Sequence, residues 1–80
     1  KEKEMMRILD VDTKKTYSIE KITEELKRDS ATISFLQNHN MVPGSKVTVA
    51  DTGDFSITIS VNKNDYFGID KFIAKRVFVA

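Results

Sequence analysis

The sequence lacks several residue types on which catalysis, metal binding and membrane insertion often depend. Its 80 residues include no cysteine and one histidine. The absence of cysteine excludes a disulfide framework, a thiolate metal site and a thiol nucleophile. No apolar run approaches the roughly 20 residues that a transmembrane helix needs, and the N-terminus does not have the pattern of a signal peptide. We therefore expect a cytoplasmic protein without membrane insertion.

Neither sign of charge is in excess. The chain has 13 basic and 12 acidic residues, a net charge of +1, whereas nucleic-acid binding depends on an uncompensated basic face. We therefore expect no direct nucleic-acid contact. A weaker hypothesis uses rings and cations near the C-terminus as a binding face: Lys63, Tyr66, Phe67, Lys71, Lys75 and Arg76. The favoured interpretation is that both rings pack inside and that the cations are solvated.

Proline and glycine are scarce, and short apolar stretches with a period of two lie between the turn signals. A first strand begins at Thr16, and its alternation slips by one residue between Ile19 and Ile22, which indicates a bulge. It is expected to continue until residues 27–29. The later strands are predicted from Val47 and Val49, from Phe55, Ile57, Ile59 and Val61, from Tyr66, Phe67 and Ile69, and from Val77 to Val79. A turn is expected at residues 62–65.

One short helix is predicted between the first and second strands. Asp29 and Ser30 are typical helix N-caps, and Ile33 and Leu36 then fall on one helical face. The helix must end before Pro43. The fold class is therefore mainly β, a small barrel of about five strands with one short helix, in which closure of the sheet hides the strand edges. Residues 1–15 are interpreted as a lead-in or linker, and residues 16–80 as the barrel.

No pattern of catalytic or metal-ligating residues is strong. His39 is interpreted as an exposed residue that interacts with the last carbonyls of the helix. Asp10 and Asp12 point the same way if their segment is extended, but two surface carboxylates without a third ligand are more often solvated. Asp51 and Asp54 are explained by turn chemistry. Asp29 is interpreted as an N-cap, with metal ligation as the alternative. We therefore expect no enzyme activity.

Residues 17–49, YSIEKITEELKRDSATISFLQNHNMVPGSKVTV, resemble the FeoA domain. The shared plan is a strand, a short helix that ends in an apolar residue, and then x-P-G-x-x-V-x-V. The later alternation, the alanine at 74 and the closing valines at 77 and 79 also fit. The resemblance implies an SH3-like barrel without catalytic function. This domain occurs alone as a ferrous-iron transport accessory protein and fused to the C-terminus of DtxR-type metal-dependent repressors.

Two features favour the repressor setting. The helix D-S-A-T-I-S-F-L is close to the D-P-E-L-L-x-Y-L type of the repressors, and the chain begins at Lys1 rather than at methionine. We therefore expect the C-terminal domain of an iron- or manganese-dependent repressor, which docks on its own repressor domains, with a dimer as one option for the full-length protein. The alternative is a stand-alone accessory protein that docks on a ferrous-iron permease.

The resemblance also implies candidate metal ligands. In some of these repressors the domain supplies a Glu and a Gln, three residues apart at the start of the helix, to a metal site on the dimerisation domain. These places fall on Asp29 and Thr32. Aspartate can replace glutamate as an oxygen ligand, but threonine is a poor substitute for glutamine. Fe²⁺ or Mn²⁺ is therefore expected only in the context of a full-length protein.

Overall fold

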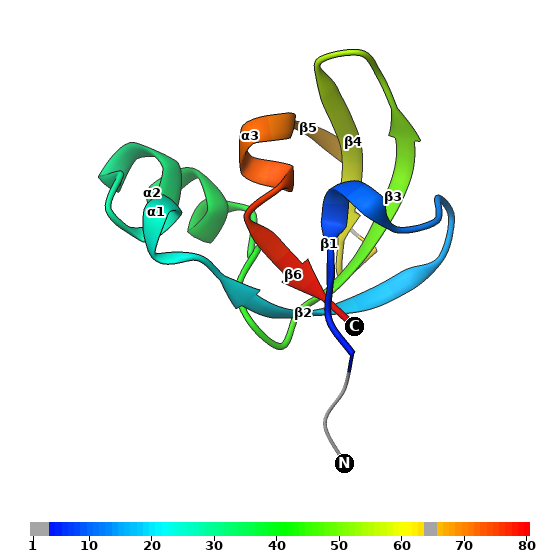
Figure 1. Ribbon diagram of the computed structural model, residues 1–80, viewed down its shortest axis with the longest axis horizontal. Helices are drawn as coiled ribbons and strands as arrows, with labels where there is room; N and C mark the ends of the chain where they lie inside the picture. The colour runs from blue at the N-terminus through cyan, green and yellow to red at the C-terminus, as the bar shows by residue number, and fades with distance from the viewer. Residues whose placement is uncertain (1–3, 64–65) are drawn as a thin grey trace.

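The computed structural model describes residues 4–63 and 66–80, in which strands predominate (Figure 1). The predicted turn at 62–65 lies partly on residues 64–65, outside the described residues. The elements are, in chain order, β1 (Met6–Arg7), the 3-10 helix η1 (Ile8–Asp10), β2 (Thr16–Ile22), α1 (Glu24–Lys27), α2 (Ser30–Asn38), β3 (Lys46–Thr52), β4 (Ser56–Val61), β5 (Tyr66–Asp70), α3 (Lys71–Ala74) and β6 (Val77–Val79).

The strands form one antiparallel sheet in the order β1-β6-β2-β3-β4-β5. The mainly β, SH3-like fold is confirmed, with a sixth strand contributed by the residues before Thr16. The expected closure of the sheet is wrong, because among the described residues β1 pairs with β6 and β5 pairs with β4, and these two strands form the edges.

The predicted bulge in β2 is present and lets one strand serve two neighbours. Residues 16–18 pair with β3, and after the register shift between Ile19 and Lys21 the strand pairs with β6. The expected continuation of this strand to residues 27–29 is wrong, because β2 ends at Ile22 and α1 follows. Glutamates at the first two positions of α1 are favoured by the helix dipole, and Leu26 anchors the turn in the core.

The predicted helix is α2, and Asp29 caps its N-terminus as expected. Leu36 is buried, while Ile33 and Phe35 pack at the margin of the core. The turn after α2 contains Gly44, whose φ of 97° is a conformation that side chains with a Cβ rarely adopt. The Gly44 N–H donates to the Ile19 carbonyl at 2.8 Å, which ties this turn to β2.

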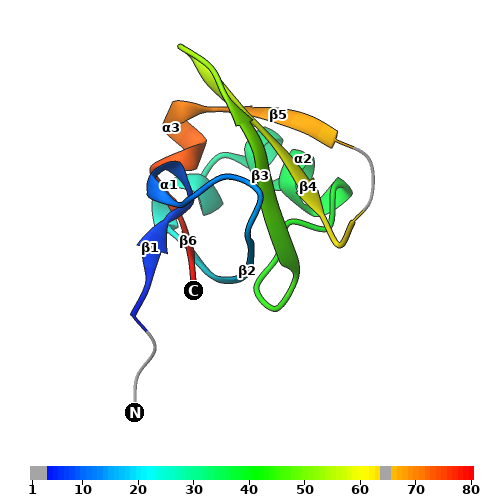
Figure 2. The same ribbon diagram turned by 90° about the vertical axis from the view of Figure 1, so that its right-hand side faces the viewer.

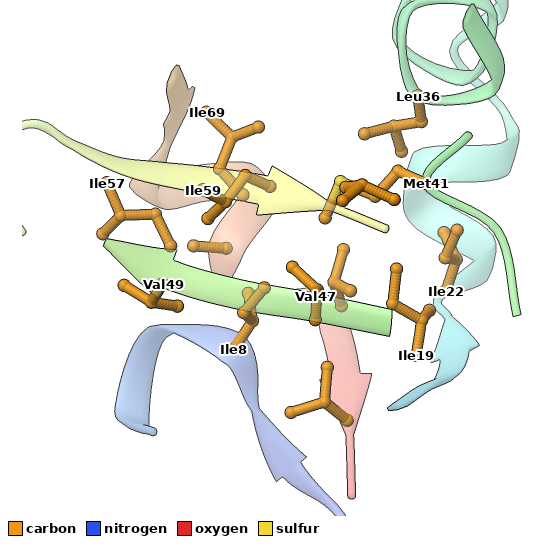
Figure 3. Packing of buried hydrophobic residues seen from close by; sticks show 14 of the residues in the cluster. Ile8, Ile19, Ile22, Leu36, Met41, Val47, Val49, Ile57, Ile59 and Ile69 are labelled. Carbon is orange, nitrogen blue, oxygen red and sulfur yellow. The ribbon is translucent and has the colours of Figure 1, made fainter. Parts of the chain in front are cut away.

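The core lies on the inner side of the curved sheet and receives side chains from almost every element (Figure 3). Its buried members are Ile8, Val11, Ile19, Ile22, Leu26, Leu36, Met41, Val47, Val49, Ile57, Ile59, Val61, Ile69, Ala74, Val77 and Val79. They alternate along β3 and β4, as the period of two predicts. The opposite face of these strands is therefore left for polar side chains.

Candidate interaction surface

The two residues predicted as metal ligands lie together at the start of α2. Asp29 Oδ1 accepts hydrogen bonds from the backbone N–H of Ala31 at 3.1 Å and of Thr32 at 3.4 Å. The Thr32 hydroxyl lies 2.9 Å from Asp29 Oδ2 and donates to it. The Thr32 hydroxyl, the Thr32 amide and the Ala31 amide lower the pKa of Asp29 from its ordinary value, and desolvation opposes them.

This arrangement is that of a helix N-cap. Both oxygens of Asp29 already accept hydrogen bonds, and the Thr32 hydroxyl is directed to that same carboxylate. Ligation by Asp29 and Thr32 in a full-length protein stays a prediction of the family resemblance.

The other predicted carboxylates have partners of their own. Asp10 accepts from Arg7 Nε at 2.8 Å, and an Asp12 oxygen lies 3.3 Å from Lys15 Nζ. Asp51 accepts from the N–H of Thr52 at 2.9 Å, but it lies at the end of β3 and not in the turn where it was expected. Within residues 4–63 and 66–80, no three side chains of His, Cys, Asp or Glu gather into a group that could hold a metal ion.

His39 lies in an aromatic cluster that joins the end of α2 to β5. Its ring stacks on Phe67, with centroids 4.0 Å apart and planes 19° from parallel, and Phe35 closes the cluster at 4.7 Å from His39 and 5.8 Å from Phe67. The expected exposed position is wrong, because the ring is half-buried. The backbone N–H of His39, and not its ring, donates to the carbonyls of the last helical turn.

The six residues of the nucleic-acid hypothesis are divided over different parts of the surface. Phe67 packs against the core as expected, but Tyr66 is 68% exposed, so the expectation that both rings pack inside is wrong for Tyr66. Strand alternation places these two neighbours on opposite faces of the sheet. Arg76 lies 3.9 Å from the centroid of Phe72, and its Nε lies 3.2 Å from a carboxylate oxygen of Glu25.

Two exposed phenylalanines lie at one end of the sheet, and sequence reasoning did not identify them. Phe55 is 84% exposed and Phe72 is 56% exposed. The N–H of Lys71 donates to the Phe55 carbonyl at 3.2 Å, which connects the tip of the β3–β4 hairpin to the start of α3. Phe55 was expected to continue the inward alternation of β4, but it lies before the strand, in the hairpin between β3 and β4. This hairpin projects at the top of Figures 1 and 2. We call Phe55 and Phe72 the aromatic end.

Comparison with known proteins connects this fold to one family. The sequence model of the FeoA domain matches residues 6–80. The structure is similar to that of an iron uptake regulatory protein, FeoA, with a TM-score of 0.77 and 21% identity over 95% of this chain and 96% of that chain. It is also similar to IdeR of T. acidophilum, with a TM-score of 0.75 and 18% identity over 100% of this chain and 35% of that chain.

A search of curated proteins finds no match to the sequence. At these identities the two structural similarities show a shared fold. The helices of residues 4–63 and 66–80 are all too short or too polar to cross a membrane.

Proposed function

Because this chain belongs to the FeoA domain family, we propose that it is a non-catalytic module that acts by binding another protein surface. The observation that carries this proposal is the match of the whole fold both to a complete small protein and to about a third of a longer one. A fold that occurs both alone and as part of a longer chain suits a module that contacts other protein domains. The described residues offer an exposed aromatic end for such a contact.

In the first setting, the chain is the C-terminal domain of an iron- or manganese-dependent repressor. It docks on the other domains of that repressor and shifts the balance between DNA-competent and DNA-incompetent states. A docked domain can do this only if it contacts one state better than the other. The capped helix α2 supports this setting, because D-S-A-T-I-S-F-L is the segment that resembles the repressors and it forms the expected helix.

In the second setting, the chain is a free-standing accessory protein of ferrous-iron transport that docks on a permease. The similarity to FeoA favours this alternative, because it extends over 96% of that iron uptake regulatory protein. Here the aromatic end and the outward face of the sheet are available to a separate partner.

The size of the protein in its source cells distinguishes the two settings. An immunoblot with antibody raised to this chain gives a band near 9.1 kDa if the protein is free-standing. A band of roughly twice that mass or more indicates a fusion with at least one further domain.

For a fusion, the decisive assay is operator binding against metal concentration, with and without residues 1–80. We expect deletion to change the metal concentration at half-maximal binding by about tenfold, which corresponds to a typical coupling free energy. Unchanged metal-dependent operator binding after deletion rejects the regulatory setting.

A further inference from the structure

The outward face of β3, β4 and β5 carries a row of hydroxyl groups. Thr48 pairs with Ser60, and Ser60 pairs with Tyr66, so these three residues lie side by side across the strands. Neighbouring residues such as Ile59 point into the core, and successive side chains of a strand point to opposite faces. Thr16 of β2 extends the row, because its Oγ1 lies 3.0 Å from Thr48 Oγ1.

A hollow of about 400 Å³ lies over this row. It is lined by Lys14, Thr48, Ala50, Ser60, Lys63 and Tyr66. Ser60 is only 7% exposed although its strand position points outward. Ala50 is half-buried, whereas both lysines and Tyr66 are exposed. The small residues therefore form the floor of the hollow, and the long cationic and aromatic side chains form its rim.

The two lysines on the rim have an unusual backbone conformation. Lys14 has a φ of 66° and Lys63 a φ of 62°. The other non-glycine residues with positive φ among those described are Asn40 and Asn62, and asparagine tolerates this region better than lysine does. Strained non-glycine residues of this kind concentrate at functional sites. Here both strained lysines line the same hollow.

Backbone hydrogen bonds hold both lysines in place. The N–H of Lys14 donates to the Val49 carbonyl at 2.7 Å, so the segment that joins η1 to β2 lies against β3 (Figure 2). Next to Lys63, the N–H of Asn62 donates to the Lys46 carbonyl at 2.7 Å, and the Asn62 side chain accepts from the Lys46 N–H at 3.0 Å. Hydrogen bonds therefore fix the backbone at Lys14 and next to Lys63.

The side chains that line the hollow favour a ligand that carries both a negative charge and an aromatic ring. The six described lining residues include two ammonium groups, the Thr48 hydroxyl and the ring of Tyr66, but no carboxylate. Ammonium and hydroxyl donors bind phosphate oxygens well, and the exposed ring of Tyr66 offers a face for stacking. The volume is within the range of small-molecule sites. We propose that this hollow binds a small phosphorylated compound that carries an aromatic ring, of the nucleoside phosphate class.

The test uses the full 80-residue chain, with pyrophosphate and ADP as probes in ¹H–¹⁵N correlation spectra. Both probes are expected to shift the amide signals of the lining residues saturably, with a Kd on the order of 1 mM or lower. The double variant Lys14→Asn/Lys63→Asn removes both charges and keeps a residue that tolerates positive φ. This double variant should weaken the binding of both probes by about tenfold. The matched control Lys27→Asn/Lys75→Asn removes the same charge at helix ends outside the hollow, and should change either Kd by less than about twofold.

Tyr66→Ala separates the ring from the charges. It should weaken ADP by about tenfold and leave pyrophosphate unchanged. The proposal is overturned if neither probe shows saturable binding. It is also overturned if both double variants weaken binding equally, because the binding would then come from general charge attraction. It is also overturned if Tyr66→Ala affects neither probe, or if a hexaglutamate peptide competes more strongly than ADP, which points to an acidic protein segment instead. The proposal is independent of the protein-binding function.

Discussion

At the scale of single residues, Asp29 caps the N-terminus of α2. Its carboxylate accepts two backbone N–H groups and the Thr32 hydroxyl, and these hydrogen bonds lower its pKa below the ordinary value of 3.8. A carboxyl group whose pKa is lowered by folding stabilises the folded state above its unfolded pKa. That contribution is lost as the pH falls through the folded pKa.

Asp29→Ala should therefore lower the urea midpoint of unfolding at pH 7, because the first turn of α2 loses its acceptor. The difference from the parent chain should shrink as the pH falls below 3.8, the ordinary pKa of the group. Asp12→Ala, which removes an exposed carboxylate paired with Lys15, is the control. If Asp29→Ala lowers the urea midpoint by the same amount at pH 7 and at pH 2.5, the ionised Asp29 carboxylate does not stabilise the folded state as argued.

Two glycines allow the cost of a strained backbone conformation to be measured against a control. Gly44 has a φ of 97° and open space where a Cβ would lie, whereas Gly68 in β5 has ordinary strand geometry and its added Cβ would meet the Ile57 carbonyl oxygen at 3.7 Å. Gly44→Ala should lower the free energy of unfolding by about 1–2 kcal/mol through backbone strain alone. Gly68→Ala should change it by less than about 0.5 kcal/mol. If chemical denaturation gives Gly44→Ala and Gly68→Ala the same change in free energy of unfolding, backbone strain at Gly44 is not the cause.

At the scale of elements, α2 is held to the sheet by its buried face. Leu36 is fully buried beside Met41, so Leu36→Ala leaves a cavity and should cost about 2–5 kcal/mol. A small domain has a total stability of only about 5–15 kcal/mol, and this variant should be partly unfolded at 37 °C. Ser34→Ala changes an exposed position on the same helix and is the control. If Leu36→Ala and Ser34→Ala have similar urea midpoints of unfolding, the buried side chain of Leu36 does not hold α2 to the sheet.

The elements also show where sequence reasoning reaches its limit. The period of two placed β3, β4 and β6 correctly because alternate residues such as Val47 and Ile59 are buried for one physical reason. The same period misassigned Phe55, since periodicity does not tell where a strand ends. α1 was missed because a four-residue helix is shorter than the helical period can reveal.

The sites depend on contacts between distant residues, which one sequence does not specify. The cap by Asp29 was predictable because its partners lie within three residues. The ring stack of His39 on Phe67 joins α2 to β5, and the hollow joins Lys14 to Lys63 across three strands. No local pattern encodes either arrangement.

At the scale of the whole molecule, the sheet is open, and one of its faces is buried while the other is exposed. The inner face holds the core, and the outward face and the projecting hairpin carry the exposed features (Figures 1 and 2). The carboxylates with described partners take part in helix caps, ion pairs and a hydrogen bond at the end of β3.

The most direct test of the protein-binding role is site-specific photo-crosslinking in the source cells, with a photoreactive phenylalanine at position 55. Phe55 is the most exposed of the large apolar residues described, so this replacement leaves the core intact. Position 21, an exposed residue in the part of β2 that pairs with β6 and not with β3, is the control. We predict a crosslink to a repressor domain or to a ferrous-iron permease from position 55 and none from position 21. Recovery of no protein crosslink from position 55, or the same products from both positions, contradicts the account.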